Sequence, residues 1–193
     1  NLISGPVTAA DVGANKIIIN EIKTRFPKQN WIFLSEENVN ENFDQIPSNE
    51  DWVWIIDPLD GTKDFISNTG EYATHISLTY KKKNILGVVI IPSKEELWLS
   101  LEGLGTWCES KDSVRKNFNQ ASNEVYQDLR LVISRSHRSD ALNLLVDKLK
   151  PMKVIGMGSI GFKITSIIRN IGFRIIQKKP NLKKQISNFA MGL

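Results

Sequence analysis

The feature that most constrains the fold is a pair of strand-like segments joined by a short, lysine-rich turn. Residues 75–80 and 85–91 have the composition of β-strands, and residues 81–84 between them predict a β-hairpin with a four-residue turn. Residues 52–56 predict a further apolar strand that ends at a polar turn. The chain should therefore build much of its core around an antiparallel sheet.

Helices are expected before and after this sheet. Thr8 and Asp11 form a capping-box pattern, which predicts a helix that ends near Pro27. Strands and helices then alternate in the later part of the chain, which favours layered α/β packing and two domains, 1–125 and 126–193. The apolar residues of the first helix recur at helical spacing, at Val12, Ile18, Ile19, Ile22 and Phe26. The other expected strands are 31–34, 96–100, 105–108, 129–134 and 154–155. The other expected helices are 141–149 and 159–168, the second capped by Ser159, and residues 38–51 are expected to form a polar loop.

Composition excludes several classes of protein. With 193 residues, of which 41% are hydrophobic and 24% charged, the chain can bury one sizeable core and is too apolar to be disordered. No apolar run reaches the length of a membrane span, so no membrane partner is expected. Cys108 is the only cysteine, which excludes an intrachain disulfide and a multi-cysteine zinc site. With no signal-peptide pattern, we expect a cytoplasmic protein.

The net charge of +4 hides an uneven distribution of charge along the chain. Residues 1–80 carry 12 acidic and 5 basic side chains, whereas residues 148–193 carry 10 basic and no acidic ones. The acidic part can bind cations. Few aromatic residues are interleaved with the basic charges, so a solvated basic surface is favoured over nucleic-acid binding.

The most informative segment is Asp57-Pro-Leu-Asp-Gly-Thr-Lys-Asp64, which we expect to form a tight turn that stops the preceding strand. Asp57 and Asp60 lie three residues apart, and two close carboxylates repel each other unless a cation lies between them. Oxygen ligands favour Mg²⁺ over Zn²⁺, and the backbone carbonyl of Leu59 can add a ligand. A plain turn with self-capping aspartates is the alternative.

Phosphate is the anion that this turn suggests. If Gly61 and Thr62 begin a short helix, their amides face an anion beside the cation. Glu36 follows its own short strand and approaches Asp57 if the two strands pair side by side, but a solvated loop acid is the alternative. Asp11 can act as the capping-box partner of Thr8, and this structural role is the alternative to a place in the site.

Three motifs occur in order along the chain: Pro6-Val-Thr-Ala-Ala-Asp11, Leu34-Ser-Glu-Glu37 and Trp54-Ile-Ile-Asp-Pro-Leu-Asp-Gly-Thr-Lys-Asp-Phe65. Together they resemble the inositol monophosphatase family of Mg²⁺-dependent, lithium-sensitive phosphatases, over residues 5–168. The central motif, with Gly70-Glu-Tyr72 after it, is more similar to the 3'(2'),5'-bisphosphate nucleotidases of this family than to its inositol monophosphatases. The resemblance implies an αβαβα sandwich with a mixed, mostly antiparallel sheet.

The resemblance also implies a mechanism with two Mg²⁺ ions that activate a water molecule for in-line attack on phosphorus. Thr62, paired with Asp11, would orient that water, and His75 and His137 are not expected to act as bases. Lys63 or Lys163 would neutralise a second phosphate, or both are solvated lysines. The implied catalytic residues are Thr62, Asp11 and Glu36, the substrate-binding residues Asp60, Gly61, Thr62, Gly158 and Ser159, and the metal ligands Glu36, Asp57, Leu59 and Asp60.

One motif of the family is missing. The family continues to a Trp-Asp-x-Ala segment whose Asp binds the second metal, but residues 171–193 contain no acidic residue. We therefore expect a chain that is truncated at both ends or shifted in frame, and impaired or inactive as an enzyme.

The expected family activity is removal of the 3'-phosphate of 3'-phosphoadenosine 5'-phosphate. Inositol monophosphatase and a remnant that only binds metal or phosphate are the alternatives. The expected partner is a small phosphorylated substrate, with a homodimer also considered.

Overall fold

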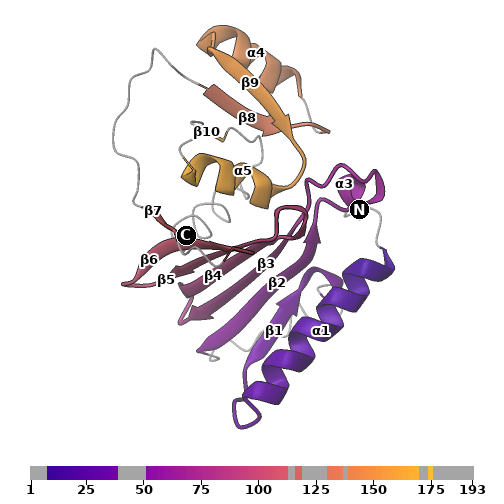
Figure 1. Cartoon of the computed structure of the whole chain (residues 1–193), viewed down its shortest axis with the longest axis vertical. Helices are drawn as coiled ribbons and strands as arrows, with labels where there is room; N and C mark the ends of the chain where they lie inside the picture. The colour runs from indigo at the N-terminus through magenta and orange to yellow at the C-terminus, as the bar shows by residue number, and fades with distance from the viewer. Residues whose placement is uncertain are drawn as a thin grey trace.

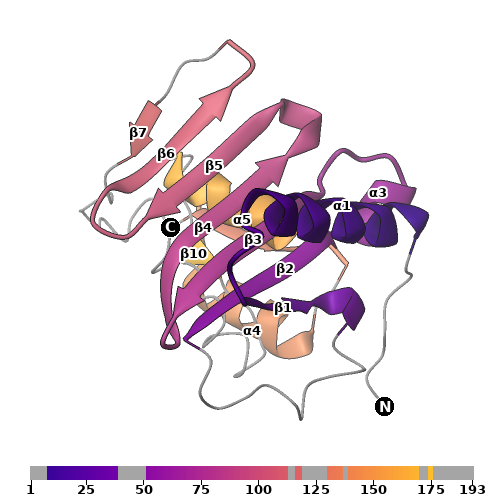
Figure 2. The ribbon, with the colours of Figure 1, turned by 90° about the horizontal axis from the view of Figure 1, so that it is seen from below.

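Helix layers and sheet layers alternate through the molecule (Figure 1). The computed structural model describes residues 8–38, 51–112, 116–118, 130–136, 139–169 and 174–175. The layers are, in order, α1 (Ala9–Arg25), a seven-stranded sheet, α5 (Ile160–Ile168), a three-stranded sheet and α4 (Asp140–Leu149). Figure 2 shows α1 and α5 on opposite faces of the larger sheet. The expected αβαβα sandwich is therefore confirmed.

The larger sheet contains its strands in chain order, with β1 parallel to β2 and the later pairs antiparallel. The predicted hairpin is confirmed, but the predicted length of its turn is wrong. Lys81 and Lys82 alone form the turn, with positive φ angles of 49° and 65°, as two-residue hairpin turns require. The strands are β1 (Ile32–Ser35), β2 (Trp52–Asp60), β3 (Ala73–Tyr80), β4 (Lys83–Ile91), β5 (Glu96–Leu101), β6 (Gly105–Ser110) and β7 (Lys116–Phe118).

Helix α1 begins where the sequence predicts, but it buries a polar side. Both hydrogen bonds of the capping box between Thr8 and Asp11 are present. Two of the apolar positions are not buried, because Val12 and Phe26 are 54% and 48% exposed, although the Phe26 ring lies 5.2 Å from the Trp31 ring. Asp11 and Asn15, one turn apart, are buried instead. The helix thus brings a carboxylate into the interior near the end of β2.

Helix α5 fills the space between the two sheets. Ser159 is its N-cap, as predicted, and accepts a hydrogen bond from the Phe162 amide at 3.0 Å. Phe162 packs against the larger sheet in a cluster with Ala73, Val89, Ile91, Trp98 and Cys108. A late segment of the chain therefore closes over the early sheet, while the division into two domains stays a prediction. The smaller, parallel sheet has the order β10 (Arg174–Ile175), β8 (Arg130–Ser134), β9 (Lys153–Met157).

The remaining described elements are short helices, η1 (Glu36–Asn38), α3 (Thr62–Ile66) and η3 (Pro92–Lys94). Within the described part of the chain, no helix has the length and apolar character needed to cross a membrane. Most of the predicted polar loop, residues 39–50, lies outside the described residues. So do His137 and residues 1–7 and 176–193.

Candidate active site

Glu36 and Asp57 lie beside each other where β1 ends. The two strands are parallel, with Ser35 opposite Ile56, so the next residue of each strand follows at the same edge. A hydrogen bond joins the Glu36 and Asp57 carboxyl groups. The predicted side-by-side pairing of the strands is thus confirmed, and it brings together two acids that are far apart in the sequence.

A β-bulge places Asp60 on the same face of the sheet as Asp57. The predicted end of the strand at Asp57 is wrong, because β2 continues through Pro58 to Asp60. Asp57 lies opposite His75 and Asp60 opposite Ala73, so three steps on β2 match two steps on β3. Regular alternation would point side chains three residues apart to opposite faces, and the extra residue of the bulge removes that difference. Proline is tolerated at such a bulge.

The Asp57 carboxyl group lies among other acids. Burial first, and then the charge of Asp60, raise the pKa of Asp57 to about 7; Glu36 adds to this effect and His75 opposes it. Burial and the charges of Asp60 and Asp11 also raise the pKa of Glu36, although its hydrogen bond with Asp57 acts in the other direction. These carboxyl groups carry more negative charge than their surroundings neutralise.

Asp60 differs from Asp57 because two donors hold it. His75 Nε2 donates to Asp60 Oδ2 at 2.9 Å, and the Gly161 amide donates to the same oxygen at 3.0 Å. Burial acts to raise the pKa of Asp60, but the hydrogen bond and charge of His75, with the Gly161 amide, outweigh it and lower the pKa. Asp60 and Asp57 in turn raise the pKa of His75 against the effect of burial. The sequence does not predict these contacts.

Thr62 and Asp11 meet as the resemblance implies. Thr62 Oγ1 lies 3.3 Å from Asp11 Oδ1 and 3.3 Å from the carbonyl oxygen of Leu59. The other Asp11 oxygen accepts hydrogen bonds from the Thr8 amide at 2.8 Å and from its hydroxyl at 2.5 Å. Asp11 therefore caps α1 and contacts Thr62 at the same time. The Leu59 amide donates to Asp57 Oδ1 at 3.2 Å, which ties this turn to the acid pair.

Gly61 joins β2 to α3 at a crowded point. Its φ angle is +93°, and a Cβ there would lie 3.1 Å from the Glu71 carbonyl oxygen and 3.1 Å from the Ser159 Cβ. The Gly158 amide donates to Glu71 Oε2 at 2.7 Å, and the Ser159 amide donates to the Glu71 carbonyl at 3.1 Å. Gly158 and Ser159 thus lie beside the Gly61 turn and are held by Glu71. Their contact with a substrate stays a prediction.

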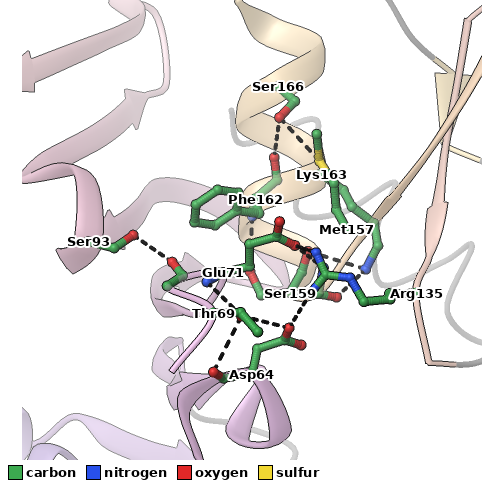
Figure 3. Close-up of polar contacts among 12 residues, drawn as sticks. Asp64, Thr69, Glu71, Ser93, Arg135, Met157, Ser159, Phe162, Lys163 and Ser166 are labelled. Atoms are coloured by element: carbon green, nitrogen blue, oxygen red, sulfur yellow. Dashed lines mark hydrogen bonds and ion pairs between the residues drawn. The ribbon is translucent and has the colours of Figure 1, made fainter. Parts of the chain in front are cut away.

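A cluster of charged side chains connects the early and late parts of the chain (Figure 3). Arg135, which follows β8, donates to Asp64 at 2.8 Å and lies 2.6 Å from a Glu71 carboxylate oxygen. Lys163 on α5 is 2% exposed and donates to the Gly158 carbonyl at 2.6 Å, so the expected solvated lysine is wrong. Burial lowers the pKa of Lys163 despite the neighbouring acids.

Replacing Arg135 by Ala should lower the free energy of unfolding by about 1–3 kcal/mol, because it leaves Asp64 and Glu71 close together without their cation. Urea unfolding followed by circular dichroism measures this change. Arg25→Ala is the matched control, since Arg25 pairs with Glu21 on an exposed helix surface and should change stability by less than about 0.5 kcal/mol. Equal losses in the two variants would contradict a structural role for the cluster.

The oxygen atoms gathered around Glu36 and Asp57 fit a hard divalent cation. Glu36, Asp57, Asp60 and the Leu59 carbonyl offer oxygen atoms, the ligands that Mg²⁺ prefers. The raised pKa of Asp57, about 7, marks a place where a cation would relieve repulsion between carboxylates. Over the residues that the structure describes, no three His, Cys, Asp or Glu side chains already form a group that could hold a metal ion. The complete ligand set therefore stays a prediction.

Comparisons with known proteins agree with this fold. The model of the inositol monophosphatase family matches residues 3–181. The 3'(2'),5'-bisphosphate nucleotidase CysQ of Buchnera aphidicola is 36% identical over 154 residues, and that of Salmonella typhimurium is 34% identical over 162 residues. Each alignment covers 80% of this chain, but only 55% and 59% of the respective relative. The chain thus spans somewhat more than half the length of these relatives.

A solved structure of similar fold is a dual specific IMPase/NADP phosphatase bound with D-inositol-1-phosphate. Its TM-score is 0.77 at 20% sequence identity, and the alignment covers 97% of this chain and 70% of that chain. This similarity supports the fold, and the match of the family model extends over most of the sequence. The chain therefore belongs to the inositol monophosphatase family.

Proposed function

We propose that the chain belongs to an Mg²⁺-dependent phosphomonoester hydrolase that removes the 3'-phosphate of 3'-phosphoadenosine 5'-phosphate. The observation that carries this proposal is the pair of acids beside the Gly61 turn, an exposed Glu36 and a partly buried Asp57, with the pKa of Asp57 raised to about 7. The 3'(2'),5'-bisphosphate nucleotidase activity named for the two bacterial relatives supports a nucleotide substrate. Lithium sensitivity, a cytoplasmic location and a homodimer stay predictions.

Glu36, Asp57, Asp60 and the Leu59 carbonyl would hold the cations. When bound, Mg²⁺ lowers the pKa of water and offsets negative charge on phosphoryl and leaving-group oxygens. Asp57 already holds a hydrogen bond from the Leu59 amide at 3.2 Å, which limits its rotation. Positioning of this kind supplies much of the rate in phosphoryl transfer.

Thr62 would orient the attacking water. Its hydroxyl hydrogen is directed to Asp11 or to the Leu59 carbonyl, both at 3.3 Å, so its oxygen lone pairs can accept a hydrogen bond from water. The Gly61 and Thr62 amides would bind phosphate oxygens. Lys63 is exposed beside this turn and is our candidate for neutralising the second phosphate of the substrate.

Release of inorganic phosphate from 3'-phosphoadenosine 5'-phosphate and from inositol 1-phosphate tests the proposal. Because residues 171–193 supply no acidic ligand, we expect slow release, but faster from the nucleotide than from inositol 1-phosphate in Mg²⁺, and none in EDTA. Faster release from inositol 1-phosphate would instead favour an inositol monophosphatase. Binding of Mg²⁺ without release from either substrate would favour the third possibility, a chain that binds metal or phosphate without catalysis, for which the acid-free sequence of residues 171–193 is the specific observation.

A further inference from the structure

His75 is a buried histidine to which neither the predicted mechanism nor the family resemblance gives a role. We propose that it is a positioning residue, which together with the Gly161 amide holds the Asp60 carboxylate by one oxygen so that the other oxygen is presented to a cation. This inference rests on the proposed function, because it concerns how the site prepares Asp60 as a ligand.

The two hydrogen bonds to Asp60 fall on the same atom. His75 Nε2 and the Gly161 amide lie 2.9 Å and 3.0 Å from Asp60 Oδ2. Two donors on one oxygen fix the rotation of the carboxylate about its side-chain torsion. The described contacts place no donor on the other Asp60 oxygen, Oδ1. Oδ1 is therefore the oxygen that we expect to bind a cation.

The backbone holds His75 in the position this role requires. On β3, His75 lies directly opposite Asp57, and the bulge of β2 brings Asp60 to the same face. Helix α5 covers the imidazole ring so closely that a Cβ on Gly161 would lie 3.1 Å from His75 Cε1. The His75 side chain is 9% exposed, so the ring has little space in which to rotate. Strand and helix therefore clamp the donor from two sides.

Because Asp60 is largely buried, the orientation of its carboxylate depends on the hydrogen bonds from His75 and Gly161. The Asp60 side chain is 15% exposed, and a carboxylate so placed needs its hydrogen bonds from protein groups. Groups that orient a metal ligand through a hydrogen bond commonly change metal affinity by about 10–100-fold when removed. His75 acts through Asp60 and not on the substrate, which agrees with the expectation that it is not a catalytic base.

Calorimetric titration with Mn²⁺ or Mg²⁺, without substrate, tests the proposal. We expect His75→Leu to weaken cation binding about 10–100-fold. His75→Gln should restore binding to within about 3-fold of wild type, because the Gln side-chain amide can place an N–H donor close to the position of Nε2. Ser77→Ala is the matched control, since Ser77 is buried on the same face of β3 and its hydroxyl bonds Asn84 at 2.9 Å, away from the acids.

The outcomes separate the two proposals. Weakened binding in His75→Leu, rescue in His75→Gln and unchanged binding in Ser77→Ala support the role of His75. Equal or tighter binding in His75→Leu would overturn it and leave the proposed function standing. A wild-type chain that binds neither cation would overturn both. If His75→Leu does not fold, His75→Gln and His75→Asn decide, because only the Gln amide extends as far as Nε2, and equal binding in these two would overturn the role.

Discussion

Replacing Asp57 by Asn should reduce Mg²⁺-dependent phosphate release at least about 100-fold and, at the same time, make the protein harder to unfold at pH 8. Activity falls because Asn lacks the charge that holds a hard cation. Stability rises because the wild-type chain must keep the Asp57 carboxylate ionised beside Asp60 and Glu36, in a buried place that raises its pKa to about 7.

The change in stability has a defined dependence on pH. The pKa of Asp57 is raised from 3.8 to about 7 on folding, so the folded state holds this proton more strongly than the unfolded state. The free energy of unfolding therefore falls as the pH rises from about 4 to about 7, and the loss is complete above that range. Asp57→Asn should add roughly 1–3 kcal/mol at pH 8 and nothing near pH 4.

Urea unfolding in EDTA, at both pH values, measures this effect. Asp64→Asn is the matched control, because Asp64 accepts hydrogen bonds from Arg135 at 2.8 Å and from Thr69 at 2.9 Å and is therefore a satisfied acid. It should lower stability at pH 8, the opposite of the change expected at Asp57. A loss of stability in both variants at pH 8 would show that the acid pair does not carry an excess of charge.

The sequence predicts those parts of the fold that neighbouring residues decide. The capping box at Thr8 and the N-cap at Ser159 depend on residues within one helical turn, and both are present. The hairpin between β3 and β4 was predictable for the same reason, although its turn is shorter than expected. Glu36 reaches Asp57 because each follows an apolar segment and the two segments pair in parallel.

Contacts between distant residues decide the rest of the site. Gly161 bonds Asp60 across 101 positions of the sequence, and Arg135 bonds Asp64 across 71 positions. No local pattern encodes such contacts, and the bulge that turns Asp60 toward His75 depends on the register of β2 against β3. Glu71 had a signal in the Gly70-Glu-Tyr72 motif, but the motif alone could not assign its hydrogen bond to the Gly158 amide.

Gly161→Ala should be strongly destabilising, although alanine is the better helix former. The added Cβ would lie 2.6 Å from the Ala73 Cβ, 3.0 Å from Val89 Cγ1 and 3.1 Å from His75 Cε1, in the core between α5 and the larger sheet. The helix must then move away from the sheet. We expect a loss of about 1–3 kcal/mol in the free energy of unfolding, together with weaker cation binding as the Gly161 amide leaves Asp60.

Two further variants distinguish this clash from a general effect of alanine. Gly13→Ala in α1 should stabilise the protein by about 0.5–1 kcal/mol, since a Cβ at Gly13 meets nothing within 4 Å. Ala73→Gly removes the closest obstacle, so it should recover much of the loss when combined with Gly161→Ala. The coupling energy between positions 73 and 161 should then exceed about 1 kcal/mol in a double-mutant cycle. Additive effects at the two positions would mean that the close contact between Gly161 and Ala73 does not set the position of α5. Something other than this contact would then place the Gly161 amide beside Asp60.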